Sequence, residues 1–174
     1  MVKRLAGVPR KLKASFRGER PPMTLKYACW SFATSIVGIL AIYAIANLAG
    51  QTLLIAPLAA SDVLLFGASD SSLAQPRNLV GGHLISAGVA VLTVALFGTS
   101  QLTMALAVGF AVLLMNLTHT THPPGGATAF IGAQGHAGPV FIFVPVLAGA
   151  LILLAVALFT NNVVYRRRYP RHWL

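Results

Sequence analysis

Apolar residues fill this chain in long blocks, which are interrupted at only a few places by short polar or proline-rich stretches. Crossing about 30 Å of hydrocarbon takes about 20 apolar helical residues, so blocks of this length predict membrane-spanning helices. Four blocks meet or approach that length: residues 27–49, 79–98, 101–118 and 139–160. Only Gly98, Thr99 and Ser100 separate the second block from the third, which predicts a tight turn between two antiparallel helices.

Two further apolar segments are too short or too interrupted to be plain spans. Residues 52–68 contain Pro57 and Asp62, and residues 118–134 contain two prolines and two glycines. A helix from residue 124 to residue 134 would cover only about 16 Å, or about half of the membrane. Irregular backbone at that depth is tolerated only where it is buried in protein or lines a wet cavity. We therefore predict an all-α membrane protein, a compact bundle of four full transmembrane helices and two broken, half-membrane helices.

The two broken segments are related by a constant spacing of 67 residues. This offset places Pro57, Ala60 and Ser61 on Pro124, Ala127 and Thr128. The same offset places five residues of the second span on identical residues of the last: Gly82, Leu84, Ile85, Val89 and Ala90. We infer an internal duplication, with repeats of about residues 27–98 and 99–165. The repeats are parallel if the broken segments return to the side they came from, and inverted if they cross, as in many transporters.

Charge is nearly absent from the apolar region. The chain is 56% hydrophobic and only 9% charged, which excludes an ordinary soluble domain. Of its 13 Lys and Arg residues, Arg77 is the one that lies between residues 27 and 165. An even number of crossings puts the basic segments 1–26 and 166–174 on one side, which the positive-inside rule makes cytoplasmic. We predict a multi-pass protein of the cell inner (plasma) membrane, surrounded by the lipid bilayer, with both termini cytoplasmic.

The same pattern argues against several function classes. The net charge of +10 flanks the apolar block instead of lining a face, so we expect no nucleic-acid partner. The lone Cys29 cannot form an internal disulfide. His119 and His122 have no nearby third ligand, so we expect no metal. Hydrolase signatures are missing, and we expect neither an enzyme nor a cofactor. Small residues four apart on two helices favour helix contacts, including those of a homo-oligomer.

The segment around His122 carries the sharpest local signal. A residue before proline is pushed into extended conformation, and a proline suits the first helical position. The residues that follow would present first-turn N–H groups at the positive end of the helix dipole, which favours an anion site. The alternative is a packing kink in which glycines let helices approach closely. The candidate substrate-binding residues are His119, Thr121, His122, Pro123, Pro124, Gly125, Gly126, Ala127 and Thr128, with Pro57, Ala60 and Ser61 of the earlier segment.

Three polar residues are candidates for coupling or for the pathway. Burying Asp62 in the membrane is costly unless it is paired, so it either couples protons or cations or pairs with Arg77 or His83. The Arg77 guanidinium suits planar oxyanions, but an arginine near a span end also serves as an interface anchor. His83 either relays protons or forms hydrogen bonds between helices.

The string from His122 to Ala129, HPPGGATA, resembles the signature of the HPP family of integral membrane proteins. Residues 61–78 are similar to the second recurrent block of that family, and the resemblance covers about residues 25–165. It implies a compact bundle, described as four membrane spans, that is found in bacteria and plastids. Plastid and cyanobacterial relatives are associated with nitrite transport. One departure is Asp62, where the family pattern has a small neutral residue; a carboxylate near an anion path would repel the substrate.

The sequence and the resemblance together predict a transporter or channel for a small inorganic anion, with nitrite as the leading candidate. In this hypothesis the helix start after His122 holds the anion. Two alternatives stay open. One is a membrane subunit or scaffold that transports nothing, and the other is a proton-coupled or cation permease centred on Asp62.

Overall fold

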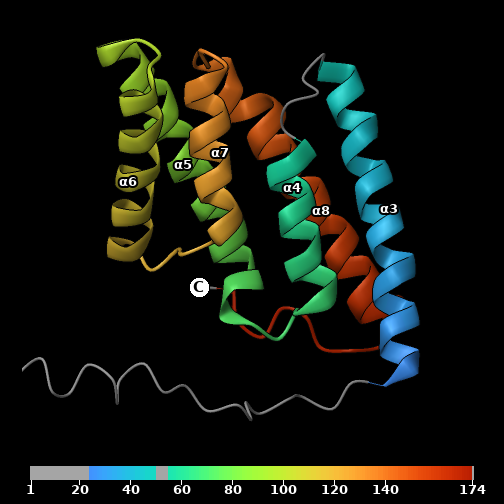
Figure 1. Ribbon diagram of the computed structural model, residues 1–174. Coiled ribbons are helices and arrows are strands. Elements are labelled where there is room, and N and C mark those ends of the chain that lie inside the picture. The colour runs from blue at the N-terminus through green and yellow to red at the C-terminus, as the bar shows by residue number, and fades with distance from the viewer. Residues whose placement is uncertain (1–23, 50–54, 174) are drawn as a thin grey trace, which may run out of the picture.

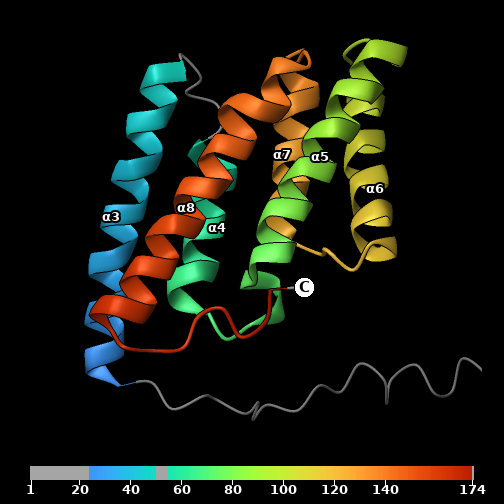
Figure 2. The same cartoon turned by 180° about the vertical axis from the view of Figure 1, so that it is seen from behind.

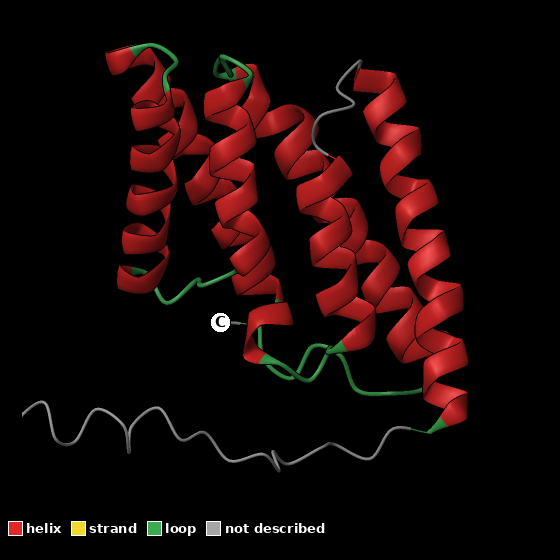
Figure 3. Cartoon of the chain, viewed as in Figure 1, coloured by secondary structure: helices red, strands yellow, loops and turns green. Residues whose placement is uncertain are grey.

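The computed structural model describes residues 24–49 and 55–173. Residues 1–23 of the predicted basic segment and residues 52–54 of the first broken segment lie outside these ranges. Within them the chain consists of helices and loops, without β-strands (Figure 3). In chain order the main helices are α3 (Leu25–Ala49), α4 (Ile55–Asp62), α5 (Pro76–Phe97), α6 (Gln101–Leu117), α7 (Pro123–Gln134) and α8 (Ala148–Leu158). The π-helical turn η2 (Val63–Gly67) continues α4, and the 3-10 turn η3 (Ser72–Ala74) precedes α5. Helix α8 is flanked by η4 (Ile142–Leu147), which is kinked at Val144 where φ is −130° and ψ is 115°, and by the π-helical turn η5 (Phe159–Val164).

Most helix ends fall within a few residues of the predicted limits. Three stretches are long and apolar enough to cross a membrane: Leu25–Leu48, Pro76–Phe97 and Ile142–Val164. Helix α6 has 17 residues and α7 has 12, so both are shorter than these. Helix α5 begins three residues earlier than expected, because Pro76 occupies its first position, where proline is well tolerated. The all-helical membrane bundle is confirmed, and the count of four full and two half-length helices stays a prediction.

The helices alternate in direction along the chain, so that each one returns toward the end where the previous one began (Figure 1). Helix α3 begins and η5 ends at the same end of the bundle, the lower end in Figure 1. We call this the basic end, because Lys26 lies in the first turn of α3 and four arginines follow η5: Arg166, Arg167, Arg168 and Arg171. Helices α5, α6 and α7 pack as one group, and α3, α4 and α8 pack as another (Figures 1 and 2).

Small side chains fill the α5–α6–α7 group. Ala107 and Ala111 of α6 and Ala129 and Ala133 of α7 are completely buried there. Large side chains instead cover the outer surface, among them Leu96, Leu102, Phe110, Leu113 and Phe143. Exposed apolar surface on this scale would promote aggregation of a soluble protein, whereas in a bilayer it faces acyl chains.

Two glycines determine how closely the short helices approach the long ones. A Cβ atom added to Gly82 of α5 would lie 2.5 Å from Cβ of His122 and 3.0 Å from the carbonyl oxygen of Thr120. A Cβ atom added to Gly149 of α8 would overlap the side chain of Leu58 in α4. The start of α7 therefore lies directly against α5, and α4 lies directly against α8.

The segment after η5 folds back across the basic end. The hydroxyl of Tyr169 donates to the carbonyl oxygen of Ala74 at 2.7 Å, and the amide of Arg171 donates to Oε1 of Gln75 at 2.8 Å. Arg171 also forms an exposed ion pair with Asp70 at 2.7 Å. Burial raises the pKa of Tyr169, so its hydroxyl stays a donor at neutral pH. These contacts hold residues 166–173, the described part of the predicted basic tail 166–174, against the loop that precedes α5.

Candidate functional site

Four buried polar side chains form one continuous set of hydrogen bonds, which we call the buried chain. Ser61 of α4, His83 of α5, Thr128 of α7 and His122, which precedes α7, are all 0% exposed. The Ser61 Oγ atom lies 2.8 Å from Nε2 of His83 and 2.8 Å from Nε2 of His122. Nδ1 of His83 lies 2.8 Å from Oγ1 of Thr128, and Nδ1 of His122 lies 2.8 Å from the carbonyl oxygen of Leu73. Residues from four separate parts of the sequence thus meet inside the bundle.

Local rules explain how two of these residues reach the chain. His122 is extended, with φ −138° and ψ 102°, because Pro123 follows it. Its backbone therefore leaves the helical path, and the close approach permitted by Gly82 brings its side chain against α5. Ser61 lies one turn after Pro57 and donates a hydrogen bond to the Pro57 carbonyl oxygen at 3.1 Å as an alternative to the imidazoles.

The direction of the hydrogen bonds follows from the Leu73 end. A carbonyl oxygen only accepts, so Nδ1 of His122 carries a proton and donates to Leu73. In a neutral His122, Nε2 then accepts from the Ser61 hydroxyl. Ser61 in turn accepts from Nε2–H of His83, and Nδ1 of His83 accepts from the Thr128 hydroxyl. Every imidazole nitrogen is satisfied with both rings neutral.

The buried chain can also accept one added proton without leaving a donor unpaired. If Nε2 of His122 gains the proton, the Ser61 hydroxyl turns to the Pro57 carbonyl oxygen at 3.1 Å. If Nδ1 of His83 gains it, the Thr128 hydroxyl turns to the Pro124 carbonyl oxygen at 3.5 Å. The two ring centroids are 4.9 Å apart. Two positive charges at that separation repel by about 3 kcal/mol at an effective dielectric constant of about 20, so a second proton is disfavoured.

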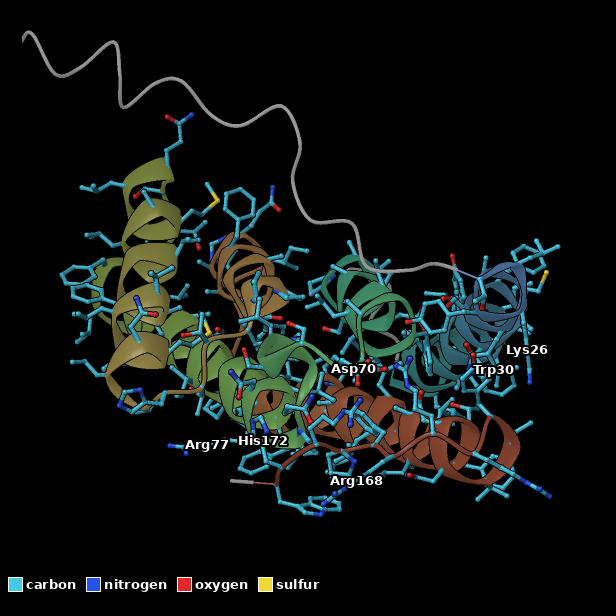
Figure 4. The ribbon with its side chains drawn as sticks, turned by 90° about the horizontal axis from the view of Figure 1, so that it is seen from below. Lys26, Trp30, Asp70, Arg77, Arg168 and His172 are labelled. Carbon is cyan, nitrogen blue, oxygen red and sulfur yellow. The ribbon has the colours of Figure 1, made fainter. Side chains whose placement is uncertain are left out.

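A polar pocket of about 400 Å³ opens beside the buried chain at the basic end, and we call it the basic mouth. Figure 4 views this end, with Arg77 and His172 close together. Arg77 donates to the carbonyl oxygen of Thr118 at 2.8 Å, and Asn78 donates to that of Thr121 at 2.7 Å. The first turn of α5 thereby holds the loop before α7 in place. The lining residues are Ser72, Leu73, Arg77, Asn78, His119, Thr121 and His172.

The basic mouth and the buried chain share Leu73. This residue lines the mouth, and its carbonyl oxygen accepts the hydrogen bond from His122. The sequence indicated Arg77, His119 and Thr121, but it gave no reason to place Leu73, Asn78 or His172 beside them. His172 reaches the mouth because the segment after η5 folds back, and no local pattern encodes that contact.

The predicted helix-start site is more enclosed than the sequence suggested. Pro123 and Pro124 have no N–H group, and the Gly125 N–H donates to the His122 carbonyl oxygen at 2.8 Å. A Cβ atom added to Gly125 would lie 2.9 Å from the carbonyl oxygen of Gly82, so close helix packing alone accounts for this glycine. Gly126 is different, because no atom lies within 4 Å of its Cβ position.

The remaining residues of the predicted substrate-binding set are either buried or exposed. Pro57 and Pro124 are buried and supply the spare carbonyl oxygens described above. Ala60, Pro123 and Ala127 are exposed, and none of them lines the basic mouth.

His119 and His122 lie in different surroundings although only three residues separate them. His119 is exposed at the basic mouth with a φ of 55°, and His122 is buried against Ser61. Within residues 24–49 and 55–173, no three His, Cys, Asp or Glu side chains come together as metal ligands would.

Asp62 is 1% exposed, and its Oδ1 atom has no hydrogen-bond partner among the described residues. Gly38 of α3 makes room for the carboxyl group, because a Cβ atom there would overlap it. Of the two alternatives for Asp62, pairing with Arg77 or His83 is wrong: Arg77 donates to the loop before α7, and both nitrogens of His83 belong to the buried chain.

A family model described as the HPP transmembrane region matches residues 20–170. The chain belongs to the HPP transmembrane family. It is also similar to two proteins of Dictyostelium discoideum that are named only as transmembrane proteins. One is 43% identical over 177 residues, covering 94% of this chain and 62% of the relative, and the other is 42% identical over 170 residues, covering 90% and 55%. The chain thus spans about six-tenths of the length of these relatives. No solved structure matches the HPP chain.

Proposed function

We propose that this HPP-family protein moves a small inorganic anion across the membrane and has no enzymatic role, with nitrite as the leading candidate. The observation that carries the proposal is the link through Leu73, which lines the basic mouth and whose carbonyl oxygen accepts a hydrogen bond from His122 of the buried chain. Ionisable side chains inside a membrane bundle are rare and mark substrate or proton pathways. Here two imidazoles and two hydroxyls are fully buried and form one connected set of hydrogen bonds inside the bundle.

The charge of the basic mouth favours an anion. Arg77, His119 and His172 line the pocket, and no acidic side chain of residues 24–49 or 55–173 lines it. Asp70, which among the described residues is the acid at the same end, is paired with Arg171. A concave site lined by one sign of charge raises the local concentration of ions of the opposite sign. The planar guanidinium of Arg77 suits a planar oxyanion such as nitrite.

Beyond the mouth, polar groups are available to replace the hydration shell of the anion. The Nε2–H of His83 and the hydroxyls of Ser61 and Thr128 are donors that turn between partners. The open space beside Gly126 adds room at the positive end of the α7 dipole. The predicted helix-start site thus enters the proposal in a reduced form, without the Gly125 amide.

Matched contacts support an inverted internal duplication. Leu58 packs on Gly149, and the residues 67 positions away, Gly125 and Gly82, also pack on each other. The back-bond from Ser61 to Pro57 has its counterpart in the back-bond from Thr128 to Pro124. The alternating directions of α3 to α8 mean that each helix of the first half runs opposite to its counterpart (Figure 1). We propose six crossings, alternating access between the halves, and a cytoplasmic basic end.

Oligomerisation is part of the proposal in a restricted form. Gly82 and Ser86 are buried within one copy of the chain, where they pack against the start of α7. Ala105 and Gly109, a second pair of small residues four apart, are exposed on α6 and are therefore available to a second copy.

The test is nitrite uptake into liposomes that contain the purified chain. We expect uptake above that of protein-free vesicles. Arg77→Gln should raise the half-saturating nitrite concentration, and Arg168→Gln, a change of an exposed cation at the same end, should not. Nitrate and chloride in parallel assays establish selectivity. No flux of any small ion through a folded protein would reject transport and favour the membrane scaffold.

A cation permease centred on Asp62 is the second candidate, and the unpartnered Oδ1 atom of that buried carboxyl favours it. This candidate requires cation flux that Asp62→Asn abolishes, with no anion flux in the wild-type protein. Anion flux that persists in Asp62→Asn would reject it.

A further inference from the structure

We propose that the buried chain takes up one proton for each anion that passes, so that the protein performs electroneutral proton–anion cotransport. This inference rests on the proposed anion transport and adds the coupling ion and its stoichiometry. Its foundation is the geometry of Ser61, His83, His122 and Thr128, which are linked by contacts of 2.8 Å.

The buried chain has room for one added proton. With both imidazoles neutral, the Leu73 carbonyl oxygen imposes a single direction on all the hydrogen bonds. A proton added to either ring is accommodated when one hydroxyl rotates, because Pro57 and Pro124 provide spare carbonyl oxygens. The proximity of the two rings, 4.9 Å between centroids, opposes a second proton. The buried chain therefore alternates between a neutral state and a state that carries one positive charge.

A proton on the buried chain has no acidic partner nearby among the residues that the structure describes. The neighbours of the two imidazoles are hydroxyl groups from α4 and α7 and the Leu73 carbonyl oxygen, and none of these is negative. The Asp62 carboxyl faces Gly38 of α3, and Asp70 is paired with Arg171. The charged and titratable side chains that line the mouth, Arg77, His119 and His172, are cationic or neutral. In the described part of the chain, a buried imidazolium thus has no acidic partner.

An unpaired buried charge is costly, and a charge of opposite sign relieves that cost. An anion that enters from the basic mouth supplies the opposite charge. Proton binding and anion binding must therefore favour each other, since coupling between two binding sites is reciprocal. No bond in the anion breaks: a proton binds at Nε2 of His122 or Nδ1 of His83, the anion binds beside it, and both leave on the other side. The net charge moved is zero.

The experiment separates the two driving forces in liposomes that contain the full chain. Nitrite uptake is measured under an inward proton gradient at zero membrane potential, and under a membrane potential at equal pH. Protein-free vesicles provide the baseline, because nitrous acid crosses bilayers unaided. We expect uptake above baseline with the proton gradient, one proton taken up per nitrite, and no response to the potential. Uptake that follows the potential without proton movement would overturn cotransport while leaving anion transport intact. No uptake under either force would reject the proposed transport itself.

Matched variants test whether the buried chain is responsible for the proton-coupled uptake. Ser61→Ala removes the hydroxyl that joins the two imidazoles, and Ser86→Ala is the control, a buried serine of α5 outside the chain. Thr128→Val removes the hydroxyl that is hydrogen-bonded to Nδ1 of His83. Thr93→Val is its control, because Thr93 is a buried threonine whose hydroxyl donates to carbonyl oxygens of its own helix. We expect both chain variants to lower gradient-driven uptake by about tenfold, the size of one lost buried hydrogen bond.

The same variants make the proposal refutable if one of them misfolds. Thr128→Ser keeps the hydroxyl and should recover most of the uptake lost in Thr128→Val. If Ser61→Ala does not fold, the threonine pair alone decides the outcome. Gradient-driven uptake in folded Thr128→Val that equals uptake in Thr93→Val would overturn the assignment of the proton to the buried chain.

Discussion

Helix α5 offers a matched pair of glycines that tests how packing creates the site. Gly82→Ala would place a Cβ atom 2.5 Å from Cβ of His122, an atom fixed close to the backbone, and 3.0 Å from the Thr120 carbonyl oxygen. Gly88→Ala, on the same helix, would add a methyl group where no atom lies within 4 Å. The two variants make the same chemical change, and only the first should push the loop before α7 away from α5.

We expect the two variants to change the free energy of unfolding in opposite directions. Replacing glycine by alanine inside a helix stabilises by about 0.5–1 kcal/mol, and Gly88→Ala should gain about this amount. Overpacking costs about 1–3 kcal/mol. Displacing His122 also weakens its hydrogen bond with Ser61, which is worth about 0.5–1.5 kcal/mol. Gly82→Ala should therefore lose about 0.5–4 kcal/mol overall, the sum of the two losses less the helix gain.

The measurement is the free energy of unfolding in mixed detergent micelles, followed by circular dichroism as sodium dodecyl sulfate is added. Nitrite uptake should fall in Gly82→Ala and stay at the wild-type level in Gly88→Ala. If Gly82→Ala were as stable as Gly88→Ala and transported as well, close contact at Gly82 would not position His122, and the packing argument would be refuted.

Three further changes can be measured by the same unfolding titration. Gly38→Ala should lower the free energy of unfolding by at least about 2 kcal/mol from overpacking, because the new Cβ would overlap the Asp62 carboxyl and lie 2.8 Å from the Phe66 ring. Adding Asp62→Ala to this variant should restore part of the loss. If the effects of the two substitutions were strictly additive, the contact between the two residues would be contradicted. Asp70→Asn should cost less than about 1 kcal/mol, since Arg171 and Asp70 are 50% and 58% exposed, and a larger loss would show a stronger role for the pair. Tyr169→Phe should cost about 0.5–1.5 kcal/mol for its bond to Ala74. Burial raises the pKa of Tyr169, so the wild-type protein should lose stability above about pH 10, where the tyrosine of the unfolded chain ionises. The Tyr169→Phe variant should lose less stability over the same pH range. Equal losses of stability in the two proteins would contradict the burial of Tyr169.

Features governed by neighbouring residues were predictable from the sequence. The limits of α3 and α6 follow from apolar length, and the start of α7 follows from the residues after His122. The tight turn after α5 also forms where expected, with Gly98 at a φ of 67° and the Ser100 side chain accepting from the Thr103 amide. Each of these rests on a steric or capping rule that acts within a few residues.

Features that depend on tertiary contact were not predictable. Nothing local indicates that Ser61 joins His83 to His122, because these residues come from different helices that meet only after packing. His172 reaches the basic mouth only through the fold-back of the segment after η5. The energetic cost of burying a carboxylate suggested that Asp62 has a partner. The space beside Gly38 accommodates the carboxyl group, but among the described residues it supplies no hydrogen-bond partner for Oδ1.

Nitrogen-15 solid-state NMR of the histidines in lipid bilayers tests most directly whether the buried chain is the working site. Without nitrite, we expect one buried imidazole protonated at Nδ1 and one at Nε2, assigned to His122 and His83 with single His→Gln variants. Addition of nitrite at mildly acidic pH should convert one buried ring to imidazolium. Buried imidazole signals that stay unchanged at saturating nitrite would contradict the account.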